Sequence, residues 1–219
     1  MSTDTRPRVL IVLGHPSAQS FNSALVDAAA GAAKDAGATV DVLRLGDLVF
    51  DPVLHAGFSE PQPLEPDLQK AQQALLDADH VVWVFPQWWG GLPALLKGFI
   101  DRVFLPGFAF RYVEGRSVPE KLLTGRSSRW VMTMDSPSWW YRLAYRNTVD
   151  RALGTATLRF SGFAPVDRSV VANVRALDDA QRQRALHKVA HDVRRDVQRL
   201  HKRLHKRRGK RLLPAPSVS

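Results

Sequence analysis

The sequence predicts an α/β protein built around a doubly wound parallel sheet. Short, apolar, β-branched runs alternate with helix-like segments, and five such runs occur, which is the pattern of consecutive strand–helix units. The chain has 219 residues, of which 45% are apolar and 24% charged, so it is long enough for a domain with a sizeable core. We therefore expect one domain with five strands in a single sheet.

The first half of the chain supplies three strands. The run RVLIVL at 8–13 is apolar and ends at Gly14, as a buried parallel strand does. The Ala-rich segment 21–36 favours a helix, TVDVLRL at 39–45 favours a second strand, and residues 46–66, rich in Pro and Gly, favour an excursion outside the core. The remaining elements of this half are a helix at 67–79 and a strand, HVVWVF, at 80–85.

The second half supplies two more strands and the longest helix. Residues 92–104 favour a helix with Pro93 tolerated in its first turn, and residues 108–118 favour a small hairpin or lid. SRWVMTM at 128–134 is predicted as the fourth strand. The elements that complete the chain are a helix from about 141 to 160, a strand at 166–174, a charged helix from Asp178 or Asp179 to about 207, and a fraying tail at 208–219.

The net charge of +10 belongs almost entirely to the end of the chain. Between Lys188 and Arg211 eleven lysines and arginines face two aspartates, which leaves +9 on this segment and the rest nearly neutral. The chain has no cysteine, which excludes disulfides and thiolate chemistry. No apolar run is long enough to span a membrane, and the N-terminal run is shorter than a signal-peptide core. We expect a cytoplasmic protein.

The basic terminal segment allows two interpretations. Val193, Val197, Leu200 and Leu204 form one apolar stripe of a helix with cations around it. The stripe can pack on the sheet, which makes residues 1–200 the domain and 201–219 a basic C-terminal extension. Alternatively, a cationic amphipathic helix can lie on an anionic membrane surface or on nucleic acid. The tail has no aromatic residues, which weakens a single-strand-binding interpretation.

The loop after the first strand has the composition of a phosphate site. In a doubly wound sheet, ligands bind beyond the carboxyl ends of the strands, near the point where the strand order reverses. GHPSAQSFN at 14–22 combines hydroxyls and amides with the N–H groups of a helix N-terminus, which together can cradle a phosphate. It carries neither a GxGxxG fingerprint nor a GxxxxGK[ST] loop. Alternatively, Ser20 is only a helix N-cap, and His15 is either a general base or a hydrogen-bonding loop residue.

Two aromatic loops follow the third and fourth strands. PQWWGGLP at 86–93 places Trp88 and Trp89 before two glycines, which allow a ligand or another chain to approach closely. MDSPSWWYR at 134–142 adds a second tryptophan pair. Such loops suit a ligand with a phosphate end and a flat end, such as flavin mononucleotide. Alternatively, one tryptophan of the first pair covers the core and the other packs at an interface. The scattered histidines predict no metal site.

Two motifs resemble those of the flavodoxin-like NAD(P)H:quinone oxidoreductases, the family that includes DT-diaphorase and the potassium-efflux ancillary reductases. LIVLGHPSAQSFN resembles the family's first loop, and FPQWWGGLPALLKGFIDRVFLPGFAF resembles its longest motif, P-x-x-W-x-x-x-P-A-x-L-K-G-x-x-D/E-R-V followed by G-F-A-Y. The resemblance covers roughly residues 8–175. It implies a flavodoxin-like three-layer sandwich with a five-stranded parallel sheet in the order 2-1-3-4-5 and helices on both faces, and it makes residues 1–200 a flavin-binding domain.

The resemblance and the loop chemistry together assign the site residues. The flavin's phosphate and ribityl side would be held by His15, Ser17, Ser20, Phe21 and Asn22. The isoalloxazine would lie along Pro86, Gln87, Trp88 and Trp89, with Thr133, Met134, Asp135 and Ser136 on its other side. The substrate pocket would be lined by Ala109 and Phe110 from the partner subunit and by Trp139, Trp140 and Tyr141. Family members are usually homodimers that share the site, so a homodimer is implied.

The activity that the resemblance implies is hydride transfer from NAD(P)H through FMN or FAD to a quinone or similar electrophile, with no single acid or base. Two departures from the family occur: Thr133-Met134-Asp135-Ser136-Pro137 replaces T-T-G-G, and Phe110 replaces a tyrosine. A carboxylate beside a reduced flavin anion disfavours it unless Asp135 turns away or accepts backbone hydrogen bonds. The alternative function is a flavin-binding regulatory or membrane-associated subunit with little reductase activity.

Overall fold

A five-stranded parallel sheet forms the middle layer of the protein. The structure, a computed structural model, describes the backbone of residues 6–211 and the side chains up to Lys206. The strands of the sheet are β1 (Arg8–Leu13), β2 (Thr39–Arg44), β3 (His80–Pro86), β6 (Ser127–Thr133) and β7 (Val166–Val171). They lie in the order β2-β1-β3-β6-β7 and pair in parallel throughout. The predicted order 2-1-3-4-5 is confirmed, because β4 and β5 belong to a separate hairpin.

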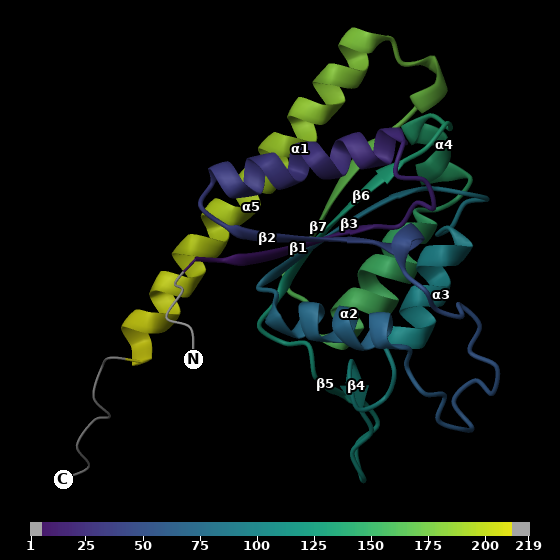
Figure 1. Ribbon diagram of the computed structural model, residues 1–219, viewed down its shortest axis with the longest axis vertical. Helices are drawn as coiled ribbons and strands as arrows, with labels where there is room; N and C mark the ends of the chain where they lie inside the picture. Colours follow the sequence, from purple (N-terminus) through teal and green to yellow (C-terminus); the bar gives the residue numbers. More distant parts are fainter. Residues whose placement is uncertain (1–5, 212–219) are drawn as a thin grey trace.

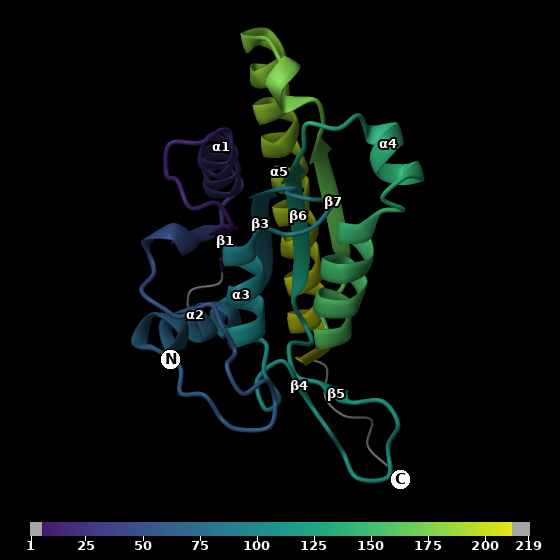
Figure 2. The ribbon, with the colours of Figure 1, turned by 90° about the vertical axis from the view of Figure 1, so that its right-hand side faces the viewer.

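Helices cover both faces of this sheet, as Figures 1 and 2 show. On one face lie α1 (Phe21–Asp35) and α5 (Asp179–Arg211). The other face is covered by α2 (Pro66–Asp77), α3 (Ala94–Val103) and the π-helix η2 (Asp150–Arg159). Successive strand residues point to opposite faces of the sheet, so each strand contributes side chains to two hydrophobic cores. In β1, Val9 and Ile11 pack toward α1 and α5, whereas Leu10 and Val12 pack toward α2 and α3.

Three predicted boundaries differ from the structure, two of them because of backbone turns. The helix predicted from 141 to 160 is interrupted: α4 (Ser138–Leu143) ends before Arg146 and Asn147, whose φ values of 49° and 53° are incompatible with a right-handed helix. The strand predicted to reach 174 ends at Val171, since Asn173 has φ 55° and a 3-10 turn, η3 (Val174–Ala176), follows. The last helix extends past its predicted end to Arg211.

The hairpin expected at 108–118 is present, and it lies beyond the sheet. Its strands β4 (Phe110–Arg111) and β5 (Glu120–Lys121) pair antiparallel, with Phe110 opposite Lys121. Figure 2 shows this hairpin at the end of the sheet opposite α4. A short 3-10 helix, η1 (Leu45–Asp47), begins the excursion that follows β2.

The excursion at 46–66 is held against the domain by one buried guanidinium. Arg102 of α3 is fully buried and donates to the Glu65 carboxylate at 2.9 and 3.1 Å, to the Pro63 carbonyl at 2.9 Å and to the Asp51 carbonyl. Burial would raise the pKa of Glu65, but the Asp51 N–H and the Arg102 guanidinium outweigh it and lower that pKa. The arginine of the motif GFIDRV therefore fixes a loop more than 35 residues away in sequence, as its contact with Glu65 shows.

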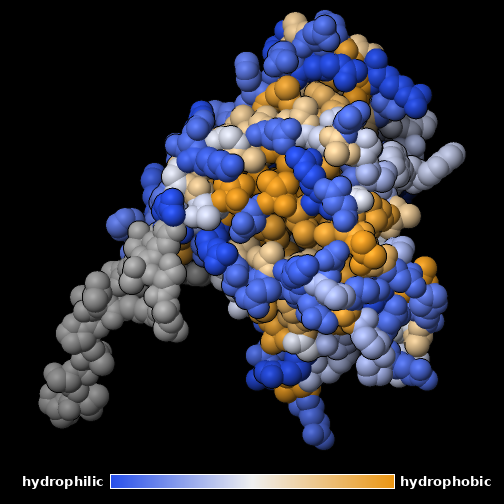
Figure 3. Space-filling view, in the orientation of Figure 1, coloured by the Kyte–Doolittle hydropathy of each residue, from blue (hydrophilic) through white to orange (hydrophobic). Residues whose placement is uncertain are grey.

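The edge strand β2 leaves part of the sheet open to solvent. Figure 3 shows apolar side chains in a band across this face, at the height of β2 in Figure 1. Val42 is 41% exposed there. Its neighbour Asp41 carries a charge and lies 3.8 Å from Arg8. Charged side chains on an exposed edge disfavour pairing with a strand of another molecule.

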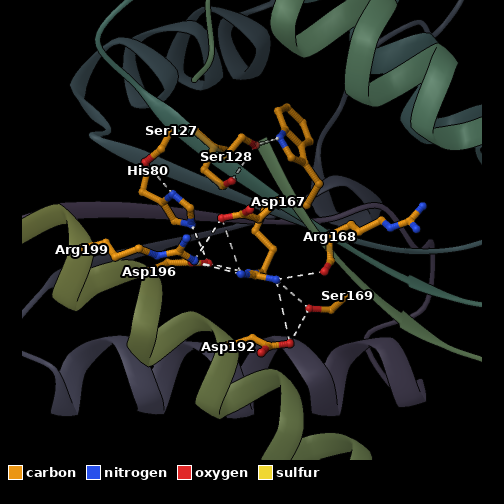
Figure 4. A network of polar contacts seen from close by, with 12 residues as sticks. His80, Ser127, Ser128, Asp167, Arg168, Ser169, Asp192, Asp196 and Arg199 are labelled. Carbon is orange, nitrogen blue, oxygen red and sulfur yellow. Dashed lines mark hydrogen bonds and ion pairs between the residues drawn. The ribbon is translucent and has the colours of Figure 1, made fainter. Parts of the chain in front are cut away.

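A buried polar network attaches α5 to the middle of the sheet (Figure 4). Arg129 of β6 and Asp196 of α5 are each 5% exposed, and the guanidinium donates to both carboxylate oxygens, in one case at 2.9 Å. His80 Nε2 lies 3.5 Å from the same carboxylate, and its Nδ1 lies 2.9 Å from Ser127 Oγ. Burial would raise the pKa of Asp196, but His80 and Arg129 outweigh it and hold that pKa below its ordinary value.

The attachment continues past the predicted domain boundary at residue 200. Helix α5 runs through this position without a break. His201 Nε2 lies 3.0 Å from the Ala36 carbonyl oxygen, and Arg203 donates to the Ala164 carbonyl at 3.1 Å. The first residues of the predicted extension 201–219 therefore still contact the domain. Within residues 6–211, none of the helices combines the length and apolar character needed to cross a bilayer.

We expect Asp196→Asn to lower the free energy of unfolding by about 3–5 kcal/mol, because it removes the carboxylate in direct contact with the buried Arg129 guanidinium. The matched control is Asp35→Asn. The Asp35 side chain of α1 is 68% exposed and pairs with Arg194 of α5, the helix that also carries Asp196. Exposed pairs contribute less than about 1 kcal/mol, so the control should unfold like the wild type. Urea unfolding followed by tryptophan fluorescence measures both differences.

The same comparison has a defined pH dependence. The pKa of Asp196 is lowered in the folded protein, so its contribution to stability is present above the unfolded carboxyl pKa of about 3.9 and is lost as the pH falls through the lower folded value. The gap between wild type and Asp196→Asn should therefore stay constant from neutral pH to about pH 5 and close only in stronger acid. A gap that already closes above about pH 5 contradicts this assignment.

Candidate functional site

The loops after β1, β3 and β6 meet at one end of the sheet, beside α4 (Figure 2). Two backbone hydrogen bonds join them: Gly14 N donates to the Val84 carbonyl at 2.8 Å, and Gln87 N donates to the Thr133 carbonyl at 2.7 Å. The buried side chains of Asn22 and Thr133 also exchange hydrogen bonds at 3.1 and 3.2 Å. The structure thus brings together the three loops that the sequence singled out.

The first loop is ordered by its own side chains. Ser20 Oγ accepts from Ser23 N at 3.2 Å, which confirms the predicted N-cap of α1. His15 Nδ1 accepts from Ser17 N at 3.0 Å, and Ser17 Oγ accepts from Gln19 N at 3.1 Å, so both side chains act as hydrogen-bonding loop residues. The first N–H groups of a helix have no partner within it, and the first turn of α1 has no acidic residue. This N-terminus favours an anion.

Two contacts that the sequence analysis missed complete the surroundings of this loop. Gly46 packs so closely on Pro16 that a Cβ atom would lie 2.3 Å from its carbonyl oxygen, so only glycine fits. The Arg182 guanidinium of α5 lies 5.3 Å from the centroid of the Phe21 ring and adds a positive charge near the N-terminus of α1. Arg182 is one cation among many in its helix, so no sequence signal distinguished it.

The tryptophan loop is a tight turn that projects its indoles outward. Trp88 N donates to the Gly91 carbonyl at 3.2 Å, and Gly91 N donates to the Trp88 carbonyl at 2.9 Å. The φ values of Trp89 and Gly90 are 49° and 73°, as a turn with two left-handed central residues requires. Trp88 is 44% exposed and contacts the edge of His15, and Trp89 is completely exposed. Neither tryptophan covers the core, so that alternative is wrong.

Gln87 carries a buried donor without a partner. Its Nε2 atom is buried, and no residue of the described chain accepts a hydrogen bond from it. A buried donor left unsatisfied costs about 1–3 kcal/mol. This donor lies one residue before the exposed indoles, in a loop that meets the first loop at the same end of the sheet. A ligand with an anionic end, a flat ring system and acceptor atoms on that ring system fits this set of groups.

The third loop pairs its carboxylate with an arginine. Asp135 accepts a hydrogen bond from Arg175 N at 3.2 Å, and its other oxygen lies 3.0 Å from Arg175 Nε. Arg175 belongs to η3, between β7 and α5. The Asp135 carboxylate is therefore paired with a cation and accepts a backbone hydrogen bond. This is one of the conditions given above under which a carboxylate at this position would not disfavour a reduced flavin. Met134 is buried and Ser136 is half-buried beside it.

The aromatic residues of α4 have different positions. Trp139 and Trp140 are 58% and 44% exposed, with ring centroids 5.6 Å apart. Tyr141 is buried and donates to Asp150 at 2.8 Å; burial raises its pKa, and the Asp150 carboxylate raises it further. Tyr141 therefore attaches α4 to η2. A cavity of about 300 Å³ beside α4 is lined by Met134, Ser138, Tyr141, Arg142, Asn147, Arg168, Ser169, Val170 and Lys188.

The two remaining pocket residues lie elsewhere in the chain. Ala109 is buried, and Phe110 is half-buried against Phe160, with ring centroids 5.1 Å apart. Both belong to the hairpin at the end of the sheet opposite α4 (Figure 2). One chain does not bring them to the three loops. Their assignment to the substrate pocket stays a prediction that requires a second chain.

The fold and the strand order define a class: a doubly wound, three-layer α/β protein with its loops converging at the strands' carboxyl ends. The chain belongs to the family described as flavodoxin-like fold, which matches residues 7–195. An uncharacterized NAD(P)H oxidoreductase of Haemophilus influenzae is 27% identical over 186 residues, covering 83% of this chain and 91% of that protein. The resemblance to the NAD(P)H:quinone oxidoreductases is thereby confirmed.

Other relatives share shorter segments or the fold. The NAD(P)H dehydrogenase (quinone) 1 of Cavia porcellus is 34% identical over 125 residues, 48% of this chain and 46% of that protein. The crystal structure of Smu.1420 from Streptococcus mutans UA159 has a TM-score of 0.71 and 31% identity, covering 86% of this chain and 99% of that one. An FMN-dependent NADH-azoreductase from Bacillus anthracis, solved with FMN, shares the fold with a TM-score of 0.67, 20% identity and coverage of 89% and 99%.

We expect Trp89→Ala and Trp89→Gly to weaken flavin binding about five- to tenfold while leaving the stability of the apoprotein unchanged or slightly higher. An aromatic stacking partner contributes about 1 kcal/mol, and Trp89 makes no buried contact and has a strained φ. Titration with FMN and with FAD, followed by fluorescence quenching, measures the affinity, and thermal unfolding measures the stability.

The glycine variant separates the ring from the backbone, because glycine adopts the φ of Trp89 without strain. Equal losses in the two variants assign the effect to the indole. Wild-type affinity in Trp89→Gly would instead show that only the turn geometry matters.

Proposed function

We propose that the protein is a flavin-dependent NAD(P)H oxidoreductase whose acceptor is a quinone or a similar electrophile. When bound, the flavin supplies the redox chemistry, accepting a hydride from NAD(P)H and passing it on. The observation that carries the proposal is the combination, at one sheet edge, of an anion-favouring helix N-terminus, the unpartnered Gln87 amide and the outward-facing Trp88 and Trp89. Relatives named NAD(P)H oxidoreductase and NAD(P)H dehydrogenase (quinone) support it.

Different residues of this chain would contact the phosphate and the ring system of the cofactor. The first turn of α1 and the loop containing His15, Ser17 and Ser20 would bind the phosphate, with Arg182 adding positive charge. Gln87 and the tryptophan turn would lie along the ring system. Thr133 and the residues after it would limit the other side, where Arg175 pairs with the Asp135 carboxylate. We assign no side chain as a catalytic acid or base, and we place the protein in the cytoplasm.

We propose that the working form is a homodimer with two shared sites. Phe110 lies at the end of the sheet opposite the three loops, so only another subunit can bring it to the ring system (Figure 2). Large aromatic faces at Trp89 and Trp139 are open to solvent in the single chain, and such groups characterise the buried centres of interfaces. The alternative of a regulatory or membrane-associated subunit with little activity depends on the altered third loop and on the basic tail. The Asp135–Arg175 pair weakens the first of these two grounds.

The purified protein should be yellow, with flavin absorbance bands, and should oxidise NADH or NADPH in the presence of a quinone. Release of the cofactor followed by mass analysis distinguishes FMN from FAD, and comparison of the two nicotinamides identifies the donor. A colourless protein that neither FMN nor FAD reconstitutes would falsify the proposal. A yellow protein that reduces no quinone would keep the flavin assignment and reject the acceptor.

We expect Arg175→Gln to lower the flavin reduction potential and slow the reduction of the flavin by NADPH about two- to fivefold. The substitution frees the Asp135 carboxylate, whose negative charge then opposes charge on the reduced flavin. The effect is modest because the pair is solvent-exposed. Anaerobic stopped-flow kinetics and redox titration measure it.

The double variant Asp135→Asn/Arg175→Gln is the control, since it removes both charges. It should return the potential and the rate close to wild type. If Arg175→Gln has wild-type values, Asp135 does not influence the cofactor and the interpretation of this loop is wrong.

A further inference from the structure

After the exposed Asp179 of its first turn, the solvent-facing side of α5 has no acidic side chain from Gln181 to Lys206. From Gln181 to Lys206 the exposed residues are exclusively glutamine, histidine, lysine and arginine. The two acids of this stretch face inward: Asp192 accepts from Ser169 Oγ at 2.8 Å, and Asp196 accepts from Arg129. Because both carboxylates are used inside, the outer face of the helix is positive or neutral throughout this stretch.

Five cations on this face form a straight row. The row consists of Arg184, Lys188, Arg195, Lys202 and Lys206. Intervals of four or seven residues place side chains on one side of an α-helix, and at 1.5 Å per residue the row is about 33 Å long. Within the described part of the chain, only Lys188 among the five has an acidic partner, Asp192 at 3.6 Å. The row is therefore a linear surface of largely uncompensated positive charge.

The opposite side of the helix is already occupied. Val189, Val193, Val197 and Leu200 are buried, the valines in the core that α5 shares with α1 and the sheet. A helix whose apolar stripe is covered cannot insert into lipid by that stripe. Any partner of the exposed row therefore binds by charge, and it must be an extended anionic surface to contact the whole row.

We propose that this cationic row docks the protein flat on an anionic phospholipid membrane. A straight row on a straight helix contacts a plane along its full length, and each cation near an anionic membrane surface adds to the attraction. In the sequence, Leu212 and Leu213 follow the last cation, and lipid accommodates such apolar residues whereas a phosphate backbone does not. The inference is independent of the proposed reductase activity.

Nucleic acid is the less favoured partner of the row. Residues outside 188–211 carry only +1 of the net charge of +10, since the segment itself carries +9, so the domain offers no second basic surface to follow a curved duplex. The exposed face of α5 has no aromatic side chain to stack on single-stranded bases. A membrane requires neither feature.

The test compares two variants that lose the same charge. The row variant replaces Arg184, Lys188, Arg195, Lys202 and Lys206 by glutamine, a residue that already occurs on this face and favours helices. The control variant replaces five exposed cations elsewhere by glutamine, namely Lys34, Lys70, Arg116, Lys121 and Arg151. Co-sedimentation uses vesicles of phosphatidylcholine with and without phosphatidylglycerol, over a series of salt concentrations. Circular dichroism and thermal unfolding confirm that both variants fold.

The wild type should bind only vesicles that contain phosphatidylglycerol, and added salt should release it. The row variant should partition at least about tenfold more weakly than the wild type, and the control variant should stay within about twofold of it. The inference is overturned if the wild type does not bind anionic vesicles at physiological salt, or if the control variant loses as much binding as the row variant.

Two further arms distinguish other sources of binding. If duplex DNA or RNA binds more tightly than vesicles at the same salt, and the row variant loses that binding, the partner is a nucleic acid and the membrane proposal fails. A truncation that removes residues 212–219 should retain most of the binding to anionic vesicles. Loss of binding in the truncation, with binding retained in the row variant, would assign the contact to the tail and reject the row.

Discussion

The buried guanidinium of Arg129 determines how α5 is arranged on the sheet. A cation in the middle of a sheet needs carboxylates close to it, because an unpaired buried charge is strongly destabilising. Helix α5 provides Asp196 in direct contact and Asp192 at 3.9 Å, and β7 adds Asp167 at 3.9 Å (Figure 4). With Asp192 and Asp196 committed to this side, α5 presents only neutral and cationic residues to solvent from Gln181 to Lys206. The anchoring of the helix and its surface charge have the same physical origin.

The geometry of the candidate site depends on the same anchoring. Helix α5 and helix α1 share one hydrophobic core, so the position of α1 on the sheet follows that of α5. The N-terminus of α1 is then fixed to β6 by the bonds between Asn22 and Thr133. The start of α5 carries Arg182 to the ring of Phe21. An anion-favouring helix terminus is thus held against the third loop by packing that begins far from it.

The sequence predicted the features that depend on local signals. All five sheet strands were identified because buried parallel strands are short apolar runs, and Ser20 was identified as an N-cap from its position before a helix. The strand order came from the family resemblance. Pairings such as Arg129 with Asp196 and Asp135 with Arg175 join residues 67 and 40 positions apart, and no local pattern encodes them. The break between α4 and η2 depends on Arg146 and Asn147, residues that helices also accept.

Trp89 combines a positive φ with a completely exposed indole, and both properties bear on what the site binds. A bulky residue with positive φ costs about 1–3 kcal/mol and persists where the surroundings or a function require it. The indole is completely exposed, so within the described chain the turn is held by the backbone hydrogen bonds between Trp88 and Gly91 and not by packing of the indole. The proposed flavin ring system and the proposed second subunit would each provide a contact for the indole that this conformation exposes. Phe110, at the far end of the sheet, is in turn available to another chain's loops and not to its own. In the proposed homodimer, the two residues would belong to one site built from two subunits.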